Sequence, residues 1–229
     1  MKISIITLFP ESIEPFLNSS ILKRAQQKGK VVFDLVNLRD FGEGKHKVVD
    51  DRPYGGGAGM VFRADILAKA VKPLLKLRTK NYELKTVLMS ASGIPYKQSK
   101  AKEFSELDHL IIVCGHYEGV DQRFIDNYVD EEITIGDYVL TGGEIPALVI
   151  VDSVTRLIPG VLEKEEATIN ESFTDNTLEH PQYTRPENFE GLAVPSILLS
   201  GDHKLIKEWR GKKSIEKTEK VRPDLVQKT

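Results

Sequence analysis

Three glycine-bearing loops hold the residues best suited to bind a small molecule. Their sequences are SASGIPY, GHYEGVDQR and GDYVLTGGE, and each follows an apolar run that predicts a buried strand. In parallel α/β sheets, ligands bind at the carboxyl ends of the strands. Glycine lets the backbone approach a ligand closely, so that main-chain N–H and C=O groups can bond to a purine ring. Each loop alone is more typical of an ordinary tight turn, but the three together favour one ligand pocket.

The third loop follows an unusual path. Residues 133–146, ITIGDYVLTGGEIP, begin as a short buried strand and then pass through two glycine turns that flank one apolar segment. Glu144 and Pro146 fit the first turn of a helix that follows. A chain that turns twice over so short a distance is expected to wrap closely around something.

The common nucleotide, hydrolase and metal signatures do not occur in this sequence. The segment YGGGAGMVFR has glycines but lacks the Lys-Ser/Thr pair of a phosphate-binding P-loop, and there is no G-x-G-x-x-G or G-x-S-x-G motif. No histidine has metal-ligand spacing to a cysteine or to another histidine, so a structural zinc site is not expected. The histidines are His46, His109, His116, His180 and His203.

The elements expected to position these loops are those of an α/β protein. Five apolar runs predict buried strands: ISIITLF, VVFDLV, TVLMS, LIIVCG and EITI. Helical patterns occur at residues 13–25, 66–75 and 147–158, and Pro73 is expected to kink or shorten the second of these helices. Strands that alternate with helices predict a mostly parallel, buried sheet.

The composition allows one core or a core with a small second domain, since 40% of the 229 residues are hydrophobic. The net charge of −2 does not suggest a nucleic-acid binder. Residues 201–229, however, contain nine Lys/Arg against five Asp/Glu, a charge of +4 (9 − 5). This tail could bind phosphates, although on charge alone a solvated helical face is the simpler explanation.

The only cysteine, Cys114, lies in an apolar run, so we expect a reduced, buried thiol in a cytoplasmic protein. No apolar run has the length needed to span a bilayer. The N-terminal residues predict a first strand rather than a signal peptide.

Changes in composition predict three regions. Residues 1–162 form the α/β domain, and the polar residues 163–179 form a flexible linker. Residues 180–229 form a small second domain, Pro-rich at first and ending in a pair of helices. Within the first domain, residues 39–60 form a long loop, and loops of this length are often functional.

Five motifs resemble those of the bacterial tRNA (guanine-N1-)-methyltransferase family: DDRPYGGGAGM, CGHYEGVDQR, IGDYVLTGGE, DSVTRLIPGVL and HPQYTRP. The resemblance runs from Met1 to about Pro223. It implies methylation of the guanosine at tRNA position 37, immediately 3′ of the anticodon, by a homodimer with shared active sites. It also implies the SPOUT fold, a parallel sheet with a deep C-terminal trefoil knot, followed by a small, mainly helical domain that binds tRNA.

The same resemblance implies S-adenosylmethionine as the methyl donor. Residues 133–146 would then thread the knot and wrap this cofactor, and Glu118 would lie near its amino group, where a carboxylate complements the positive charge. The residues carried over as cofactor contacts are Leu88, Met89, Ser90, Ala91, Gly115, Tyr117, Glu118, Ile135, Gly136, Asp137, Tyr138, Val139, Leu140, Gly142, Gly143 and Pro146.

Methylation of guanine N1 requires a base and a stabilising cation. N1 carries a proton at neutral pH, so a positioned carboxylate must remove it, while an arginine can stabilise the negative charge that develops on O6. The resemblance assigns these roles to Glu171 and Arg156. The usual base of the family is an aspartate, so Glu171 is longer by one methylene, and Asp175 is the alternative base. Glu179 matches a second carboxylate of the family. Without the resemblance, all three carboxylates would be interpreted as solvated linker acids.

A third group of residues is expected to contact RNA. His46, Asp50 and Arg52 lie in the long loop, and the resemblance brings the first two to the target base. The set is His46, Asp50, Arg52, Tyr183, Arg185, Lys204 and Arg210. The resemblance also makes Mg²⁺ a candidate cofactor, although the sequence shows no ligand cluster for it.

Two alternatives stay open at this point. One is a SPOUT methyltransferase with a different RNA target, which the motifs DDRPYGGGAGM and YTRP disfavour. The other is an RNA-binding module without catalysis, which the presence of Arg156 and of a linker carboxylate disfavours.

Overall fold

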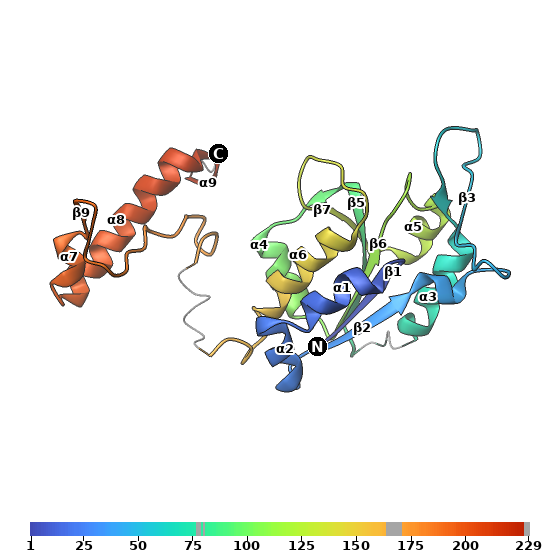
Figure 1. Cartoon of the computed structure of the whole chain (residues 1–229), viewed down its shortest axis with the longest axis horizontal. Helices are drawn as coiled ribbons and strands as arrows, with labels where there is room; N and C mark the ends of the chain where they lie inside the picture. Colours follow the sequence, from blue (N-terminus) through green and yellow to red (C-terminus); the bar gives the residue numbers. More distant parts are fainter. Residues whose placement is uncertain (77–78, 80, 164–170, 227–229) are drawn as a thin grey trace. The chain divides into compact units, whose positions relative to one another are not determined.

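The computed structural model describes the whole chain except residues 77–78, 80, 164–170 and 227–229. The chain divides into two compact units, Met1–Glu163 and Lys164–Thr229, which are described separately (Figure 1).

The first unit contains a five-stranded sheet with the strand order β2-β1-β6-β5-β7, in which every neighbouring pair is parallel. The prediction of an α/β fold with a parallel sheet is therefore confirmed. The strands are β1 (Lys2–Thr7), β2 (Val32–Asn37), β5 (Leu84–Pro95), β6 (His109–Cys114) and β7 (Glu131–Thr134).

Helices cover both faces of this sheet, which explains why its central strands are continuous apolar runs. On one face pack α1 (Pro10–Leu17), α2 (Ser20–Gln27), α4 (Gln98–Ser105) and α6 (Glu144–Thr155) (Figure 1). On the other pack the 3-10 helix η1 (Leu38–Phe41), α3 (Ala64–Leu75) and α5 (Gln122–Tyr128). Along β6, Ile112 and Cys114 face the first group, whereas Ile111 and Val113 face the second. Because strand residues alternate between faces, this one strand contributes to both halves of the core.

The predicted helix at residues 13–25 is wrong in one respect, because the structure divides it into α1 and α2. Asn18 and Ser19 separate the two helices. The Asn18 side-chain amide donates to the carbonyl oxygen of Glu14 at 3.1 Å, and the Ser19 hydroxyl donates to that of Phe16 at 2.7 Å. These side chains compete with the helical hydrogen bonds and end the first helix. Pro73 does not shorten α3, because the helix includes Pro73 and ends at Leu75, the last residue of the predicted helical pattern.

Between η1 and α3, the long loop contains a short antiparallel hairpin. Its strands are β3 (Asp50–Asp51) and β4 (Val61–Phe62), with Asp50 opposite Phe62 and Asp51 opposite Val61. The hairpin brings the two ends of the glycine-rich segment together.

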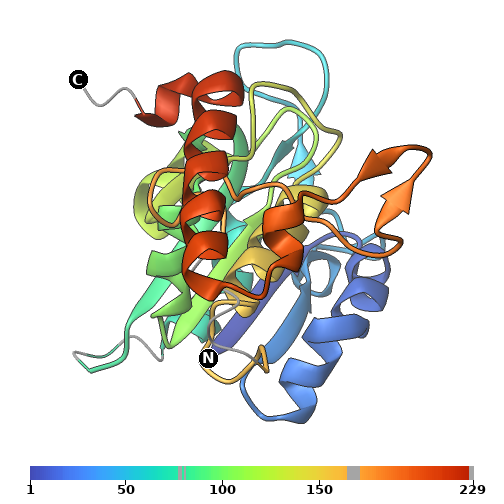
Figure 2. The ribbon, with the colours of Figure 1, turned by 90° about the vertical axis from the view of Figure 1, so that its left-hand side faces the viewer.

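The second unit is built around one long helix. It contains β8 (Asn188–Phe189), β9 (Leu192–Ala193), α7 (Ser196–Leu199), α8 (His203–Val221) and α9 (Pro223–Val226). Figure 2 shows α8 in red as one continuous helix and the β8–β9 hairpin in orange. The tail was expected to form a helix pair, and this is corrected: Gly211 lies inside α8 without ending it. A single interior glycine costs a helix only about 1 kcal/mol, which α8 tolerates.

Residues 171–179, which the sequence analysis assigns to the flexible linker, belong to the second unit and contact α8. Leu178 is buried, and its main-chain N–H donates to Thr218 Oγ1 at 2.8 Å. Its carbonyl oxygen accepts a hydrogen bond from the Ser214 hydroxyl at 2.6 Å. Residues 164–170 of the predicted linker lie outside the described residues.

Candidate active site

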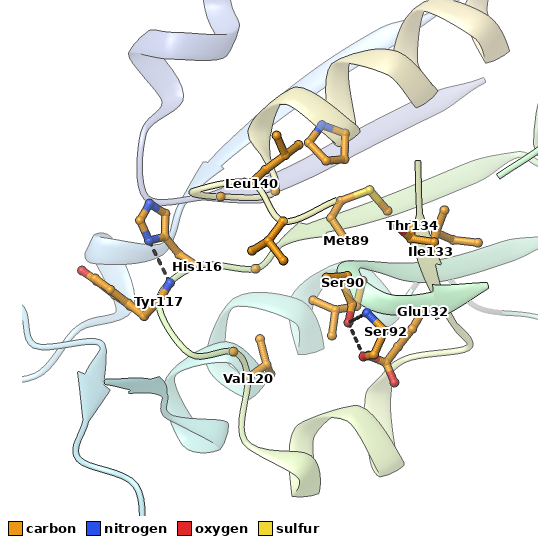
Figure 3. Close-up of a pocket in the computed structure, with 18 of the residues that line it drawn as sticks. Met89, Ser90, Ser92, His116, Tyr117, Val120, Glu132, Ile133, Thr134 and Leu140 are labelled. Atoms are coloured by element: carbon orange, nitrogen blue, oxygen red, sulfur yellow. Dashed lines mark hydrogen bonds between the residues drawn. The ribbon is translucent and has the colours of Figure 1, made fainter. Parts of the chain in front are cut away.

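An irregular part of β5 and the loops that follow β6 and β7 line one cavity of about 500 Å³ in the first unit (Figure 3). All three strands are parallel, so their carboxyl ends meet at the same edge of the sheet. The lining consists of residues 88–92, 115–120, 132–135 and 138–143 together with Gln122, Ile125 and Pro146.

A β-bulge in β5 shapes the first wall of the cavity. Met89 and Ile94 both pair with Ile133 of β7, so the residues between them leave the ladder. The hydroxyl groups of Ser90 and Ser92 are 2.8 Å apart within this bulge, as the dashed line in Figure 3 marks. The bulge thus places two polar side chains at the cavity wall.

Glycines let the loop after β6 and the loop after β7, which form the second and third walls of the cavity, pack against each other. Gly142 forms a β-bridge with His116, and the N–H of Gly143 donates to the carbonyl oxygen of Gly115 at 2.7 Å. A Cβ on Gly143 would lie 2.7 Å from the Cα atom of Cys114. A Cβ on Gly115 would lie 2.8 Å from the carbonyl oxygen of Met89. Real Cβ atoms do not approach backbone so closely, so the packing of these segments requires glycine at both positions.

The apolar tip of the third loop is largely exposed. Val139 is 85% exposed, and Tyr138 is 55% exposed although its ring lies over Gly136. All residues predicted to contact the cofactor line the cavity except Gly136 and Asp137, which lie at the turn beside it. The loop therefore presents both main-chain groups and apolar side chains at the cavity.

Sequence reasoning missed several lining residues. The neighbours of motif residues, such as His116 and Thr141, could have been included on their position alone. Gln122 belongs to the motif CGHYEGVDQR and could have been included in the same way, whereas Ile125 carried no such signal, because it reaches the cavity from α5 through the tertiary fold. The missed residues are Ser92, His116, Gly119, Val120, Gln122, Ile125, Glu132, Ile133, Thr134 and Thr141.

A hydrogen bond indicates the tautomer of His116, and burial keeps the neighbouring Cys114 thiol protonated. The main-chain N–H of Tyr117 donates to His116 Nδ1 at 2.9 Å, so neutral His116 carries its proton on Nε2. Glu144 accepts a hydrogen bond from the Thr7 hydroxyl at 2.7 Å. Burial, together with the charge of Glu144, raises the pKa of the Cys114 thiol well above its usual value. Cys114 is therefore a protonated packing residue rather than a nucleophile.

The predicted residues of the long loop lie on and around the β3–β4 hairpin. Asp50 is half-buried in β3, whereas His46 and Arg52 are exposed. Glu118, at the exposed rim of the cavity, donates its main-chain N–H to the carbonyl oxygen of Met60 at 3.0 Å. The glycine-rich segment thus ends directly beside the cavity wall.

In the second unit, three predicted RNA contacts share a cavity of about 350 Å³: Tyr183, Arg185 and Arg210. The ring of Tyr183 lies 6.2 Å from that of Trp209, measured between centroids. Lys204 is exposed in the first turn of α8 and does not line this cavity.

The predicted catalytic residues lie in different units. Arg156 is half-buried at the C-terminus of α6 in the first unit. Glu171 is half-buried at the start of the described part of the second unit, and Asp175 is exposed. Glu179, the second predicted carboxylate, accepts a hydrogen bond from the Gln182 side chain.

The model of the tRNA (Guanine-1)-methyltransferase TrmD family matches residues 1–228, nearly the whole chain. The chain belongs to the tRNA (guanine-1)-methyltransferase family. Among its relatives, the tRNA (guanine-N(1)-)-methyltransferase of Anoxybacillus flavithermus is 50% identical over 227 residues, which cover 99% of this chain and 92% of the relative. The enzyme of that name from Clostridioides difficile is 50% identical over 229 residues, covering 100% and 99%. That from Bacillus subtilis is 50% identical over 226 residues, covering 99% and 92%.

Membership of the tRNA (guanine-1)-methyltransferase family confirms the resemblance seen in the sequence and disfavours both alternatives. Within the described residues, no three or more His, Cys, Asp or Glu side chains are grouped so as to hold a metal ion. The helices among these residues also include none that is long and apolar enough to cross a membrane.

Proposed function

We propose that this chain transfers the methyl group of S-adenosylmethionine to N1 of the guanosine at tRNA position 37, immediately 3′ of the anticodon. The chain is a tRNA (guanine-N1-)-methyltransferase, since it belongs to that family over almost its whole length. The observation that carries the proposed site is the cavity between the three glycine loops, where the predicted cofactor contacts gather.

The residues of this cavity fit S-adenosylmethionine. Gly115, Gly142 and Gly143 bring backbone to its walls, where side chains would collide with neighbouring atoms. Residues 138–140 line the cavity, where their main-chain groups can reach an adenine edge, and Glu118 at the rim suits a positively charged amino group. When bound, S-adenosylmethionine supplies an activated methyl group on a sulfonium sulfur.

In the proposed reaction, the carboxylate of Glu171 accepts the proton from guanine N1. The guanidinium group of Arg156 stabilises the negative charge that then develops on O6. With its proton removed, N1 has a lone pair that would attack the methyl carbon while the bond from that carbon to the sulfonium sulfur breaks, so that a neutral thioether leaves. A positioned base of this kind typically contributes about 10²–10⁴-fold to the rate.

We further propose that the active site is completed by a second copy of the chain. Apolar side chains on α6 and the adjoining loop support this proposal, because Ile145 is 59% exposed and Val149, one turn later, is 41% exposed. Like Val139, they are exposed apolar side chains of the kind that an interface covers. The deep trefoil knot is also part of the proposal, and the contacts of Gly142 and Gly143 with the loop after β6 support it.

We assign cofactor binding and the knot to residues 1–162 and tRNA binding to residues 180–229. Residues 163–179 connect the two regions, and Leu178 among them is hydrogen-bonded to α8. The excess of positive charge in residues 201–229 and the two arginines of the second cavity support the assignment of tRNA binding. A cytoplasmic location and participation of Mg²⁺ stay predictions.

The test is incubation of the protein with methyl-labelled S-adenosylmethionine and a tRNA transcript, followed by nucleoside analysis. We expect 1-methylguanosine from a transcript with guanosine at position 37 and none from a matched transcript with adenosine there. Equal labelling of both transcripts, or labelling of ribosomal RNA alone, would contradict the proposed substrate.

A further inference from the structure

The third loop, residues 135–143, connects two distant parts of the sheet. It begins after β7, the edge strand beside β5, and it ends at α6, which packs against β1 and β6. Because the strand order is β2-β1-β6-β5-β7, the loop must pass the carboxyl end of β5 before it reaches the loop after β6. A loop segment with few contacts is among the most easily distorted parts of a fold, so its two ends need to be held.

Thr134, the last residue of β7, holds the beginning of this loop. Its hydroxyl group donates to the carbonyl oxygen of Gly136 at 2.9 Å and accepts from the N–H of Gly136 at 3.3 Å. The N–H of Tyr138 donates to the same carbonyl oxygen at 2.9 Å. The first turn of the loop is therefore fixed by the strand that precedes it.

Thr7, the last residue of β1, holds the other end. Its side chain is buried, and its hydroxyl group donates to Glu144 Oε1 at 2.7 Å. The same hydroxyl oxygen accepts a hydrogen bond from the main-chain N–H of Phe9 at 3.0 Å, so its donor and acceptor roles are both assigned. Hydrogen bonds to a carboxylate are stronger than those between neutral groups. This contact therefore ties the end of the third loop to the far side of β6.

Glu144 lies where this hydrogen bond can act on the cavity wall. It is the first residue of α6, where a carboxylate also faces the positive end of the helix dipole. It follows Gly142 and Gly143 directly, and a Cβ atom on Gly142 would collide with its Oε2. The described residues that line the cavity include Gly142, Gly143 and Pro146 but not Glu144. Glu144 thus supports the wall from behind.

We propose that Thr7 and Glu144 are positioning residues for the cofactor: their hydrogen bond holds the end of the third loop, so that residues 138–143 keep the shape that binds S-adenosylmethionine. This inference rests on the proposed function. It assigns a part in cofactor binding to β1, although the described cavity lining includes no residue of that strand. Neither side chain is required to touch the cofactor.

Thr7→Val and Thr7→Ser form a matched pair that tests the proposal. Valine keeps the branched shape but lacks the hydroxyl group, so affinity for S-adenosylmethionine without RNA should fall by roughly tenfold or more, as expected for a lost hydrogen bond to a charged group. Serine keeps the hydroxyl group and should retain most of the affinity. In methyl transfer, Thr7→Val should raise the KM for the cofactor and leave kcat nearly unchanged. Wild-type affinity in Thr7→Val, or a loss confined to kcat, would overturn the proposal.

A double-mutant cycle tests whether the two side chains act together. Glu144→Ala should also weaken cofactor binding. Adding Thr7→Val to Glu144→Ala should cost much less than Thr7→Val costs alone, because both variants remove the same contact. Full additivity would show that the two side chains act independently, which contradicts the proposal.

The matched control is Ser153→Ala, which removes another hydroxyl group that ties α6 to its surroundings. The hydroxyl oxygens of Ser153 and Tyr96 are 2.8 Å apart, near the C-terminal end of the same helix. Affinity of this variant for the cofactor should stay near that of the wild type. A loss as large as that in Thr7→Val would mean that any disturbance of α6 weakens binding, and the specific role of Thr7 would be refuted.

Hydrogen–deuterium exchange of the free protein supplies a measurement that does not depend on activity. Amides of residues 136–143 should exchange faster in Thr7→Val but not in Thr7→Ser or Ser153→Ala. Unchanged exchange in Thr7→Val, or faster exchange throughout the first unit, would overturn the local positioning role. If the wild type does not bind S-adenosylmethionine, the proposed function fails, whereas the exchange result still decides whether Thr7 holds the loop.

Discussion

The main-chain N–H of Gly143 donates a hydrogen bond of 2.7 Å to the carbonyl oxygen of Gly115. This contact joins the loop after β6 to the beginning of α6, and neither glycine has room for a Cβ atom. The shape of the proposed cofactor cavity therefore depends on two residues without side chains. The backbone of Met89 and Cys114, against which they pack, cannot move without disturbing the sheet.

Gly143→Ala should weaken binding of S-adenosylmethionine in the absence of RNA by about tenfold or more, equivalent to at least about 1.4 kcal/mol. The added methyl group would collide with the Cα atom of Cys114, so the third loop must shift. Gly142→Val should abolish binding, because its side chain would meet Glu144 and the ring of His116. Isothermal titration calorimetry measures both effects, and wild-type affinity in the two variants would place the cofactor elsewhere.

Gly211→Ala is the matched control for Gly143→Ala, and it also carries a prediction of its own about stability. Gly211 lies inside α8, and no atom lies within 4 Å of a Cβ built there. Alanine should therefore stabilise the protein by about 0.5–1 kcal/mol through its better helix propensity, with unchanged cofactor affinity. Urea denaturation measures the difference in unfolding free energy. A destabilised variant would indicate that the surface of α8 at this position is covered.

Glu171→Gln should lower the single-turnover rate of methyl transfer by about 10²–10⁴-fold, because an amide cannot accept the proton from N1. Cofactor affinity should be nearly unchanged. Glu171→Asp restores the usual side chain of the family and should keep substantial activity, while Asp175→Asn should matter much less. An inactive Asp175→Asn with a nearly normal Glu171→Gln would assign the base to Asp175 instead.

Mixing two inactive variants tests the shared active site. A Gly142→Val chain lacks the cofactor cavity and an Arg156→Ala chain lacks the proposed stabilising cation, so each should be inactive alone. If the two residues serve one site from different subunits, exchange into heterodimers should restore part of the activity. Absence of recovery in heterodimers verified by mass spectrometry would mean that both residues act from the same chain.

Because His109 is buried, we expect the free energy of unfolding to fall in mild acid. Its Nε2 lies 2.9 Å from the Ser4 hydroxyl, which donates to Asp34 at 3.1 Å and so accepts from the imidazole. Burial and, to a lesser extent, the charge of Lys2 lower the pKa of His109 from 6.5 to about 4. The unfolded chain binds a proton first as the pH falls, so the stabilising contribution is complete above about pH 6.5 and is lost progressively toward pH 4.

At pH 5 the free energy of unfolding should therefore be lower by about 2 kcal/mol than above pH 6.5 because of His109. Urea denaturation at pH 7 and pH 5 should show the loss in the wild type. His109→Gln retains a donor for Ser4 but cannot titrate, so its stability should fall less between the two pH values. Equal slopes in both proteins would mean that other groups cause the acid sensitivity.

The sequence by itself determined the class of the fold and the family. Strands such as β6 are buried on both faces, so their apolar runs are evident without any knowledge of their neighbours. Most of the cavity could also be predicted, because the residues near Gly115 and Gly142 lie in contiguous motifs. The sequence pattern did not reveal that α1 ends at Asn18 and Ser19 or that α8 continues through Gly211. Both outcomes depend on small energy differences, which a periodic pattern does not show.

Only the tertiary structure decided which distant residues meet. Ile125 reaches the cavity because α5 packs against the sheet, and Glu118 meets Met60 because two short ladders fix the β3–β4 hairpin beside the loop after β6. These contacts depend on strand register and on the direction of single side chains. A shift of one residue in register would turn those side chains to the opposite face, and no local sequence pattern specifies that choice.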